Sequence, residues 1–232
     1  MTVFDERLEK RGIQNIGEIH LSCAVAVDIS GSMSGSMNEL NEGLKLLVKS
    51  IQEDEIASGR VELSIITFGD RAKEVLPFGP ITAVEAPVVT SDGGMTHMHE
   101  AVGLALDLIE KRKSEYKAAG TPYYRPWIFM LTDGAPNDDD HGEFERLKRA
   151  QQEKKTTFYG IGIGENANKQ LLKDLNKDGI CFSASATEFR KAFLWLSTSV
   201  SMITNSTPDT KVQLENPNNN PAKYDKQIVC EA

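Results

Sequence analysis

Short apolar runs alternate with amphipathic stretches over the first 205 residues of the chain. The runs occupy residues 23–27, 63–68, 127–131, 158–163 and 180–182. They are short and show little polar alternation, which is typical of strands in a parallel sheet that is covered on both faces. Residues 72–78 are more mixed and include Pro77, so this stretch predicts an edge strand.

Helical patterns fill the intervals between these runs. Apolar residues recur at spacings of three and four within residues 37–51, 101–109 and 189–203, and shorter patterns lie at 142–155 and 171–175. Ser36 and Glu39 predict a capping box at the start of the first helix. Strands that alternate with helices predict a Rossmann-like, doubly wound α/β fold. Its sheet would be mostly parallel with one antiparallel edge strand, and helices would cover both faces.

The composition changes near residue 205, where proline and asparagine become frequent. We interpret residues 1–18 as an N-terminal extension, 19–205 as one domain and 206–232 as an Asn/Pro-rich tail. The alternating stretches KVQLE and QIVCE flank the Asn/Pro segment of this tail. Two interpretations stay open: a flexible tail, or a hairpin that pairs with the sheet edge or with a partner.

Composition and charge limit the partners and the cellular location that we expect for this chain. The chain has 232 residues, is 40% hydrophobic and carries a formal net charge of −8, so we expect neither nucleic acid nor an anionic membrane as partner. No segment approaches the roughly 20 apolar residues that span a bilayer, and the first residues lack the pattern of a secretory signal. The three cysteines are far apart and form no CxxC motif, which favours a cytoplasmic protein with reduced thiols.

Oxygen-bearing side chains follow the first apolar run. Asp28, Ser30 and Ser32 alternate in a loop of small residues. Thr96 precedes the second helical pattern, and Asp133 follows the run at 127–131. In open α/β sheets ligands bind where strands end and the strand order reverses, and carboxylates with hydroxyls are hard ligands that suit Mg²⁺. An Asp-Ser-Gly-Ser loop alone also fits a plain turn or a helix cap.

This constellation resembles the metal-ion-dependent adhesion site of von Willebrand factor A (vWA) domains. The family pattern DxSxS matches residues 28–32, Asp133 with Gly134 matches the TDG segment, and Thr96 matches the family threonine. Met95 stands where the family usually has Gly before this threonine. The resemblance covers about residues 19–204, and the segments SIITFGD and RPWIFMLTDGAPNDD resemble stand-alone bacterial domains of the tellurium-resistance-associated TerY type.

The resemblance implies a binding module and not an enzyme. It implies that Mg²⁺, or alternatively Mn²⁺ or Ca²⁺, is held by Asp28, Ser30, Ser32, Thr96 and Asp133. The ion would then bind an Asp or Glu side chain of a protein partner. For the TerY type, the implied partners are a phosphatase, a kinase or an AAA+ ATPase in a bacterial stress-response system.

Two other functions remain as alternatives. A metal-dependent hydrolase acting on phosphate esters would need a general base, for which His97 and His99 are the candidates. These histidines also fit a helix start or, less well, a zinc pair. A scaffold that binds through its tail, without metal, is the second alternative. The acidic run 138–140 favours a helix N-terminus, or else forms an acidic lip that attracts basic partners.

Overall fold

A computed structural model of the chain describes residues 12–164, 167–176, 181–184, 189–206, 211–214 and 227–229. One sheet contains six strands: β1 (Leu21–Asp28), β2 (Val61–Phe68), β3 (Ala72–Leu76), β4 (Trp127–Thr132), β5 (Thr157–Ile163) and β6 (Cys181–Ala184). Their order is β3-β2-β1-β4-β5-β6. All neighbours pair in parallel except β2 and β3, which are antiparallel. The predicted α/β fold and its antiparallel edge strand are confirmed.

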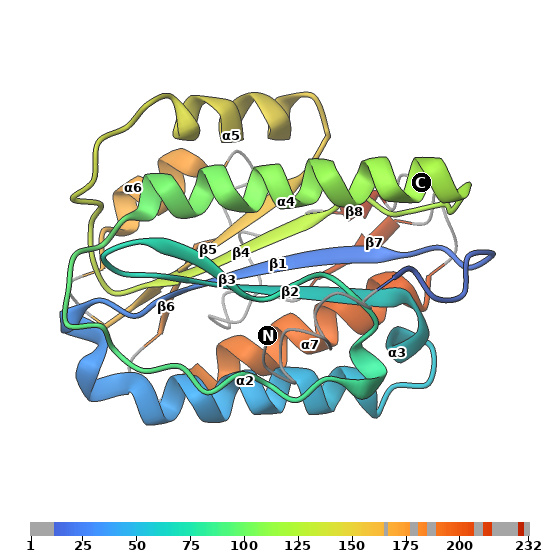
Figure 1. The fold of residues 1–232 in the computed structure, drawn as a ribbon, viewed down its shortest axis with the longest axis horizontal. Coiled ribbons are helices and arrows are strands. Elements are labelled where there is room, and N and C mark those ends of the chain that lie inside the picture. Colours follow the sequence, from blue (N-terminus) through green and yellow to red (C-terminus); the bar gives the residue numbers. More distant parts are fainter. Residues whose placement is uncertain are drawn as a thin grey trace, which may run out of the picture.

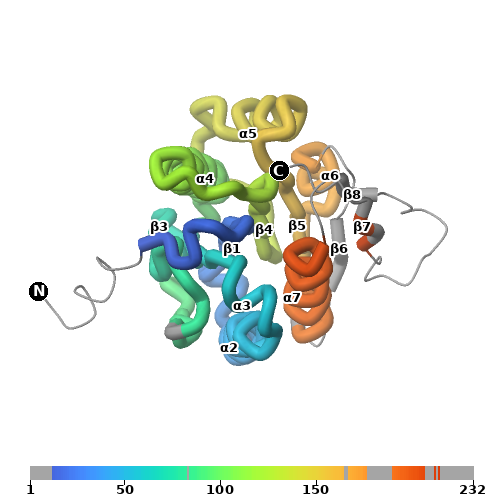
Figure 2. The backbone as a smooth tube through the Cα atoms, turned by 90° about the vertical axis from the view of Figure 1, so that its right-hand side faces the viewer, coloured from blue at the N-terminus to red at the C-terminus, as the bar shows by residue number. Residues whose placement is uncertain are grey.

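Helices cover both faces of the sheet (Figure 1). One face carries α2 (Met37–Gln52), the short α3 (Ala57–Arg60) and α7 (Phe189–Thr204). The other carries α4 (Met98–Ala119), α5 (Glu143–Gln152) and α6 (Lys169–Leu175). Figure 2 shows these three layers along the strands. None of the described helices is long and apolar enough to cross a membrane.

The central strand β1 separates two apolar layers. Successive side chains of a strand point to opposite faces. Cys23, Val25 and Val27 accordingly pack with the α2 and α7 side, whereas Ala24 and Ala26 pack with the α4 side. All eight residues of β1 are buried. This double burial explains why the strand has no polar alternation in the sequence.

A buried ionic cluster lies at the end of the sheet where β1 and β2 begin. The carboxylate of Glu62 accepts hydrogen bonds from Arg112 Nε and the Tyr116 hydroxyl, and its Oε1 lies 3.6 Å from His20 Nδ1. Arg112 Nη1 also donates to Glu115 at 2.7 Å. Burial alone lowers the pKa of Arg112, but the hydrogen bond and charge of Glu62 outweigh it and hold that pKa above its ordinary value.

The described part of the tail contains two strands. β7 (Lys211–Gln213) and β8 (Gln227–Val229) pair antiparallel as a separate two-stranded sheet. Val212 and Leu214 are buried in the same apolar cluster as α7. The two described strands thus pair with each other and not with the main sheet. The remaining tail residues, and residues 1–11 of the expected N-terminal extension, lie outside the described residues.

Candidate metal centre

Asp28 ends β1 and its carboxylate is held between two loops. Its Oδ1 accepts a hydrogen bond from the Ser30 amide at 2.9 Å, and its Oδ2 accepts one from the Thr132 hydroxyl at 2.6 Å. Thr132 ends β4, the parallel neighbour of β1. Thr132 was not among the residues predicted from the sequence, although a polar residue that closes an apolar run just before Asp133 was the available signal.

Two serine hydroxyls lie beside this carboxylate. Ser30 Oγ is 3.2 Å from Ser32 Oγ, which donates to Asp133 Oδ1 at 2.7 Å. Ser30 is buried, whereas Ser32 is exposed and Asp133 is half-buried. The structure thus brings four of the five predicted residues together at one end of the sheet, at the left of Figure 1 where β1 meets α2.

A 3₁₀ helix (Gly31–Ser36) leads from this loop directly into α2. The predicted capping box is wrong, because Ser36 makes no side-chain capping hydrogen bond. The preceding turn already delivers the chain in helical form, so no separate cap is needed. A Cβ atom at Gly31 would lie 3.1 Å from the carbonyl oxygen of Gly93, so this glycine permits the close crossing of two loops.

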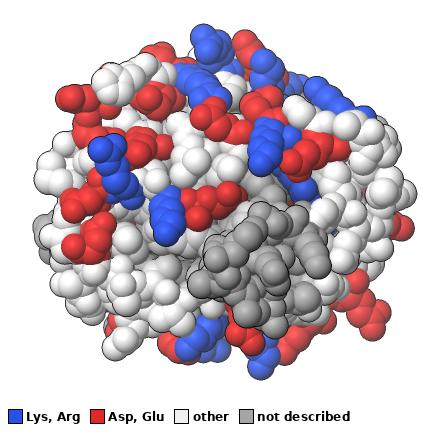
Figure 3. Space-filling view, viewed as in Figure 1, with Lys and Arg blue, Asp and Glu red and all other residues white. Residues whose placement is uncertain are grey.

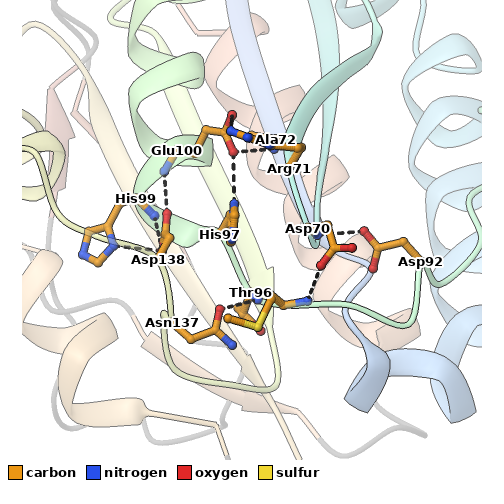
Figure 4. A network of polar contacts seen from close by, with 11 residues as sticks. Asp70, Arg71, Ala72, Asp92, Thr96, His97, His99, Glu100, Asn137 and Asp138 are labelled. Carbon is orange, nitrogen blue, oxygen red and sulfur yellow. Dashed lines mark hydrogen bonds and ion pairs between the residues drawn. The ribbon is translucent and has the colours of Figure 1, made fainter.

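Thr96 reaches the cluster from the loop before α4. A Cβ atom added at Gly134 would lie 3.7 Å from Thr96 Oγ1, which places this hydroxyl beside the Asp133 loop. The backbone N–H of Thr96 donates to the side-chain oxygen Oδ1 of Asn137 at 2.7 Å (Figure 4). The backbone N–H of Asn137 donates to the carbonyl oxygen of Thr96 at 3.2 Å. Thr96 is 6% exposed, and its hydroxyl has no hydrogen-bond partner among the described residues.

Two further aspartates fix the Thr96 loop. Asp92 accepts hydrogen bonds from the amides of Asp70 and Gly94 at 2.9 and 3.0 Å. In return, Asp70 Oδ1 accepts one from the Met95 amide at 2.9 Å (Figure 4). Met95, which departs from the family pattern, turns its side chain to solvent and is 46% exposed. The side chain of Met95, which is larger than the glycine usual in the family, therefore lies outside the loop.

The histidines near Thr96 are both paired with carboxylates. His97 Nδ1 lies 3.3 Å from Glu100 Oε2, and His99 Nδ1 lies 2.9 Å from Asp138 Oδ1. His97 is the residue just before α4, so the helix-start interpretation is confirmed. His99 is not solvated: it is 8% exposed and its ring lies 4.0 Å from that of Phe144. In Figure 4 its ring points away from Thr96.

The acidic run caps two helices. Asp138 accepts hydrogen bonds from the amides of His99 and Glu100 in the first turn of α4. Asp140 accepts them from the amides of Gly142 and Glu143 at the start of α5. The predicted role at a helix N-terminus is confirmed, but it is shared between two helices. Asp139 is exposed and takes no part in this capping.

The electrostatics of the cluster fit a divalent cation. Burial raises the pKa of Asp28, hydrogen bonds from Ser30 and Thr132 partly lower it, and the charge of Asp133 raises it further. Neither Asp28 nor Asp133 forms an ion pair within the described part of the chain. Two carboxylates and the hydroxyls of Ser30, Ser32 and Thr96 form a hard oxygen donor set, which suits Mg²⁺, Mn²⁺ or Ca²⁺.

Comparison with known proteins assigns the family. The model of the von Willebrand factor type A domain matches residues 24–195. The chain belongs to this family. An uncharacterized protein of Synechocystis sp. is 27% identical to this chain over 159 residues. The match covers 66% of this chain and 34% of that protein, so the chain spans about a third of its relative.

Solved vWA structures share the fold. The von Willebrand factor domain of the type V pili tip protein Mfa5 from Porphyromonas gingivalis has a TM-score of 0.62 at 10% identity, covering 83% of this chain and 99% of that one. A vWA protein from Catenulispora acidiphila has a TM-score of 0.58 at 14% identity, covering 80% and 43%. Proximal thread matrix protein 1 from the mussel byssus, solved with a zinc-occupied adhesion-site motif, has a TM-score of 0.56 at 17% identity, covering 80% and 48%.

The contacts of Asn137 lead to a first prediction. Asn137→Ala removes the acceptor for the Thr96 backbone N–H and leaves only the backbone hydrogen bond from Asn137 to the Thr96 carbonyl, so the threonine hydroxyl is held less firmly. We expect the affinity for Mg²⁺, measured by isothermal titration calorimetry, to fall about threefold to tenfold, or ~1 kcal/mol. Asn137→Asp keeps an oxygen at the same place and should retain most of the affinity. Equal affinities for wild type and Asn137→Ala would show that Asn137 does not position Thr96.

Proposed function

We propose that the chain is a metal-dependent protein-interaction module. Its metal site would consist of Asp28, Ser30, Ser32, Thr96 and Asp133, and would take a carboxylate from a protein partner. The observation that carries this proposal is the Thr96 hydroxyl. The residue is 6% exposed, its hydroxyl has no hydrogen-bond partner among the described residues, and it lies beside a cluster of hydroxyls and carboxylates without ion-pair partners. A zinc-occupied site of this kind in the mussel protein supports it.

The oxygen atoms of this site explain why a bound cation would bind a carboxylate of another protein. Both oxygens of Asp28 already accept hydrogen bonds, from Ser30 and Thr132, so this carboxylate is held in place and its charge is partly satisfied. The neutral hydroxyls of Ser30, Ser32 and Thr96 would contribute oxygen without further negative charge. A divalent cation bound here would supply positive charge and a coordination position for an outside carboxylate.

The same proposal includes the identity of the metal ion and the class of the protein partner. We favour Mg²⁺ because hydroxyl and carboxylate oxygens are its usual ligands in proteins. The TerY-like segments favour a cytoplasmic, bacterial stress-response setting with a phosphatase, a kinase or an AAA+ ATPase as partner. No catalytic role is included, because the Nδ1 atoms of both His97 and His99 face carboxylates and the His99 ring points away from Thr96.

A pull-down from a lysate of the source organism tests this function. The tagged chain is used in millimolar Mg²⁺, in EDTA, and in EDTA followed by excess Mg²⁺. We expect a partner that is retained with Mg²⁺, lost in EDTA and recovered on adding Mg²⁺ back. Ser30→Ala should lose this partner. Ser34→Ala is the matched control, because Ser34 is exposed and lies in the 3₁₀ helix that directly follows Ser30.

The opposite result would point to the scaffold alternative. A partner that is retained equally in EDTA and by Ser30→Ala would show that the contact does not involve the metal site. Deletion of residues 206–232 would then show whether the tail makes that contact.

A further inference from the structure

The loops that surround the candidate metal centre carry a strongly one-sided charge. We call residues 28–36, 69–71, 91–100 and 133–142 the site loops. They contain a single Lys or Arg residue, Arg71. Their acidic residues are Asp28, Asp70, Asp92, Glu100, Asp133, Asp138, Asp139 and Asp140. The whole chain is far more balanced, with 34 acidic and 26 basic residues, and Figure 3 shows both signs interspersed over one face of the molecule.

Much of this negative charge faces solvent. Asp70, Asp92, Asp139 and Asp140 are exposed, and none of them forms an ion pair within the described residues. The one cation, Arg71, is 3.8 Å from Glu100 and is thereby already paired. A single divalent cation would still leave the site loops negative. A ligand carboxylate would therefore be attracted by the ion and repelled by the rim around it.

We propose, building on the function above, that the partner presents its carboxylate within a basic segment, with Lys or Arg on both sides of one Asp or Glu. Basic neighbours convert repulsion at the rim into attraction, which acts over a Debye length of about 8 Å at physiological ionic strength. Complementary charge also speeds association and rejects wrongly charged partners.

Two further features support this partner chemistry. The Thr96 hydroxyl, which has no hydrogen-bond partner among the described residues, marks the position of the cation that would hold the partner carboxylate, so the acidic rim surrounds a site with an independent sign of a ligand. Next to it, the exposed Met95 side chain offers an apolar contact. The aliphatic stem of a Lys or Arg can cover such a surface while its charged end reaches the rim.

Three fluorescein-labelled peptides of equal length provide the test. One has a central Asp flanked by lysines, the second has the same Asp flanked by glutamates, and the third has Asn in place of Asp between lysines. Binding to the full chain is followed by fluorescence anisotropy in Mg²⁺ and in EDTA. We expect the lysine-flanked Asp peptide to bind in Mg²⁺ at least tenfold more tightly than either other peptide, and to lose this binding in EDTA.

Two variants with the same change of charge test whether the site loops are the part of the chain that attracts the lysine-flanked peptide. Asp139→Lys lies on the site loops, and Asp139 makes no hydrogen bond or ion pair with any residue that the structure describes. Glu55→Lys lies in the exposed segment between α2 and α3, at the other end of the sheet (Figure 1). Asp139→Lys should weaken binding of the lysine-flanked Asp peptide at least threefold, and Glu55→Lys should change it by much less.

The outcomes separate this inference from the function on which it rests. Binding that needs Mg²⁺ and the Asp, but is equal for lysine and glutamate flanks, would overturn the basic-segment proposal and leave the metal-dependent module intact. Equal binding of the Asp and Asn peptides, in Mg²⁺ and EDTA alike, would contradict the module itself. Failure of all three peptides to bind in Mg²⁺ would count against both.

Discussion

Asp133→Asn should lower the affinity of the chain for Mg²⁺ at least tenfold, which corresponds to about 1.4 kcal/mol. The substitution keeps the size of the side chain and removes one negative charge from the oxygen cluster. Within the described part of the chain, the side chain of Asp133 accepts a hydrogen bond only from Ser32, so the fold should be unaffected. Calorimetric titration of Mg²⁺ gives the affinity. Thermal unfolding without Mg²⁺ should give the same midpoint for variant and wild type.

Asp139→Asn is the matched control for this experiment. It removes the same charge from the same loop, but Asp139 is exposed and lies outside the oxygen cluster. We expect a change in Mg²⁺ affinity of less than about threefold, because exposed charges are screened by solvent and salt. If both variants weakened Mg²⁺ binding equally, the ion would be responding to the general charge of the loop, and Asp133 would have no specific role.

Glu62→Gln should destabilise the fold by about 3 kcal/mol, because the buried guanidinium of Arg112 loses its buried charged partner and keeps only the more exposed carboxylate of Glu115. Glu62 is 1% exposed, and its carboxylate is the shared partner of Arg112, Tyr116 and His20. Such a loss is a large share of the 5–15 kcal/mol that stabilises most domains. The free energy of unfolding, measured with urea by circular dichroism, tests this value.

Two further variants test the origin of this loss. Glu62→Gln combined with Arg112→Met removes both charges and should be less destabilising than Glu62→Gln alone. Glu18→Gln breaks the exposed pair with Arg60, whose atoms lie 2.8 Å apart, and should cost less than about 1 kcal/mol. A Glu62→Gln cost as small as that of Glu18→Gln would mean that the cluster adds little to stability.

The fold could be predicted because its strands are buried on both faces. Double burial keeps long stretches of the central strands apolar, so apolar runs such as 23–27 and 127–131 stand out from the amphipathic helices between them. The edge strand β3 was also predictable, because its exposed residues and nearby prolines differ from the central strands. These signals are local and need no knowledge of tertiary contacts.

The supporting contacts of the site could not be predicted in the same way. Asp70 and Asp92 act through backbone amides of other loops, and Asp138 caps a helix that precedes it by about 40 residues. The groups that these carboxylates bind are backbone N–H groups, which every residue except proline has, so the sequence does not show which of them will be bound. The capping box failed for a related reason: its residues were present, but the 3₁₀ turn at 31–36 had already started the helix.

The buried pairing of Glu62 with Arg112 could not be predicted for a different reason. Glu62 was visible as an acidic residue at the start of an apolar strand, but its partner Arg112 lies 50 residues away on α4. The polar side of a long helix gives no indication of which charged residue turns inward. Only the packing of α4 over β2 brings the two charges together.

The most direct test of the metal site is a crystal structure of the chain grown with Mn²⁺ and measured at the manganese absorption edge. We predict an anomalous difference peak enclosed by the hydroxyls of Ser30, Ser32 and Thr96 and the carboxylates of Asp28 and Asp133. A well-ordered site without a peak at saturating Mn²⁺, or a peak held by other residues, would contradict the assignment.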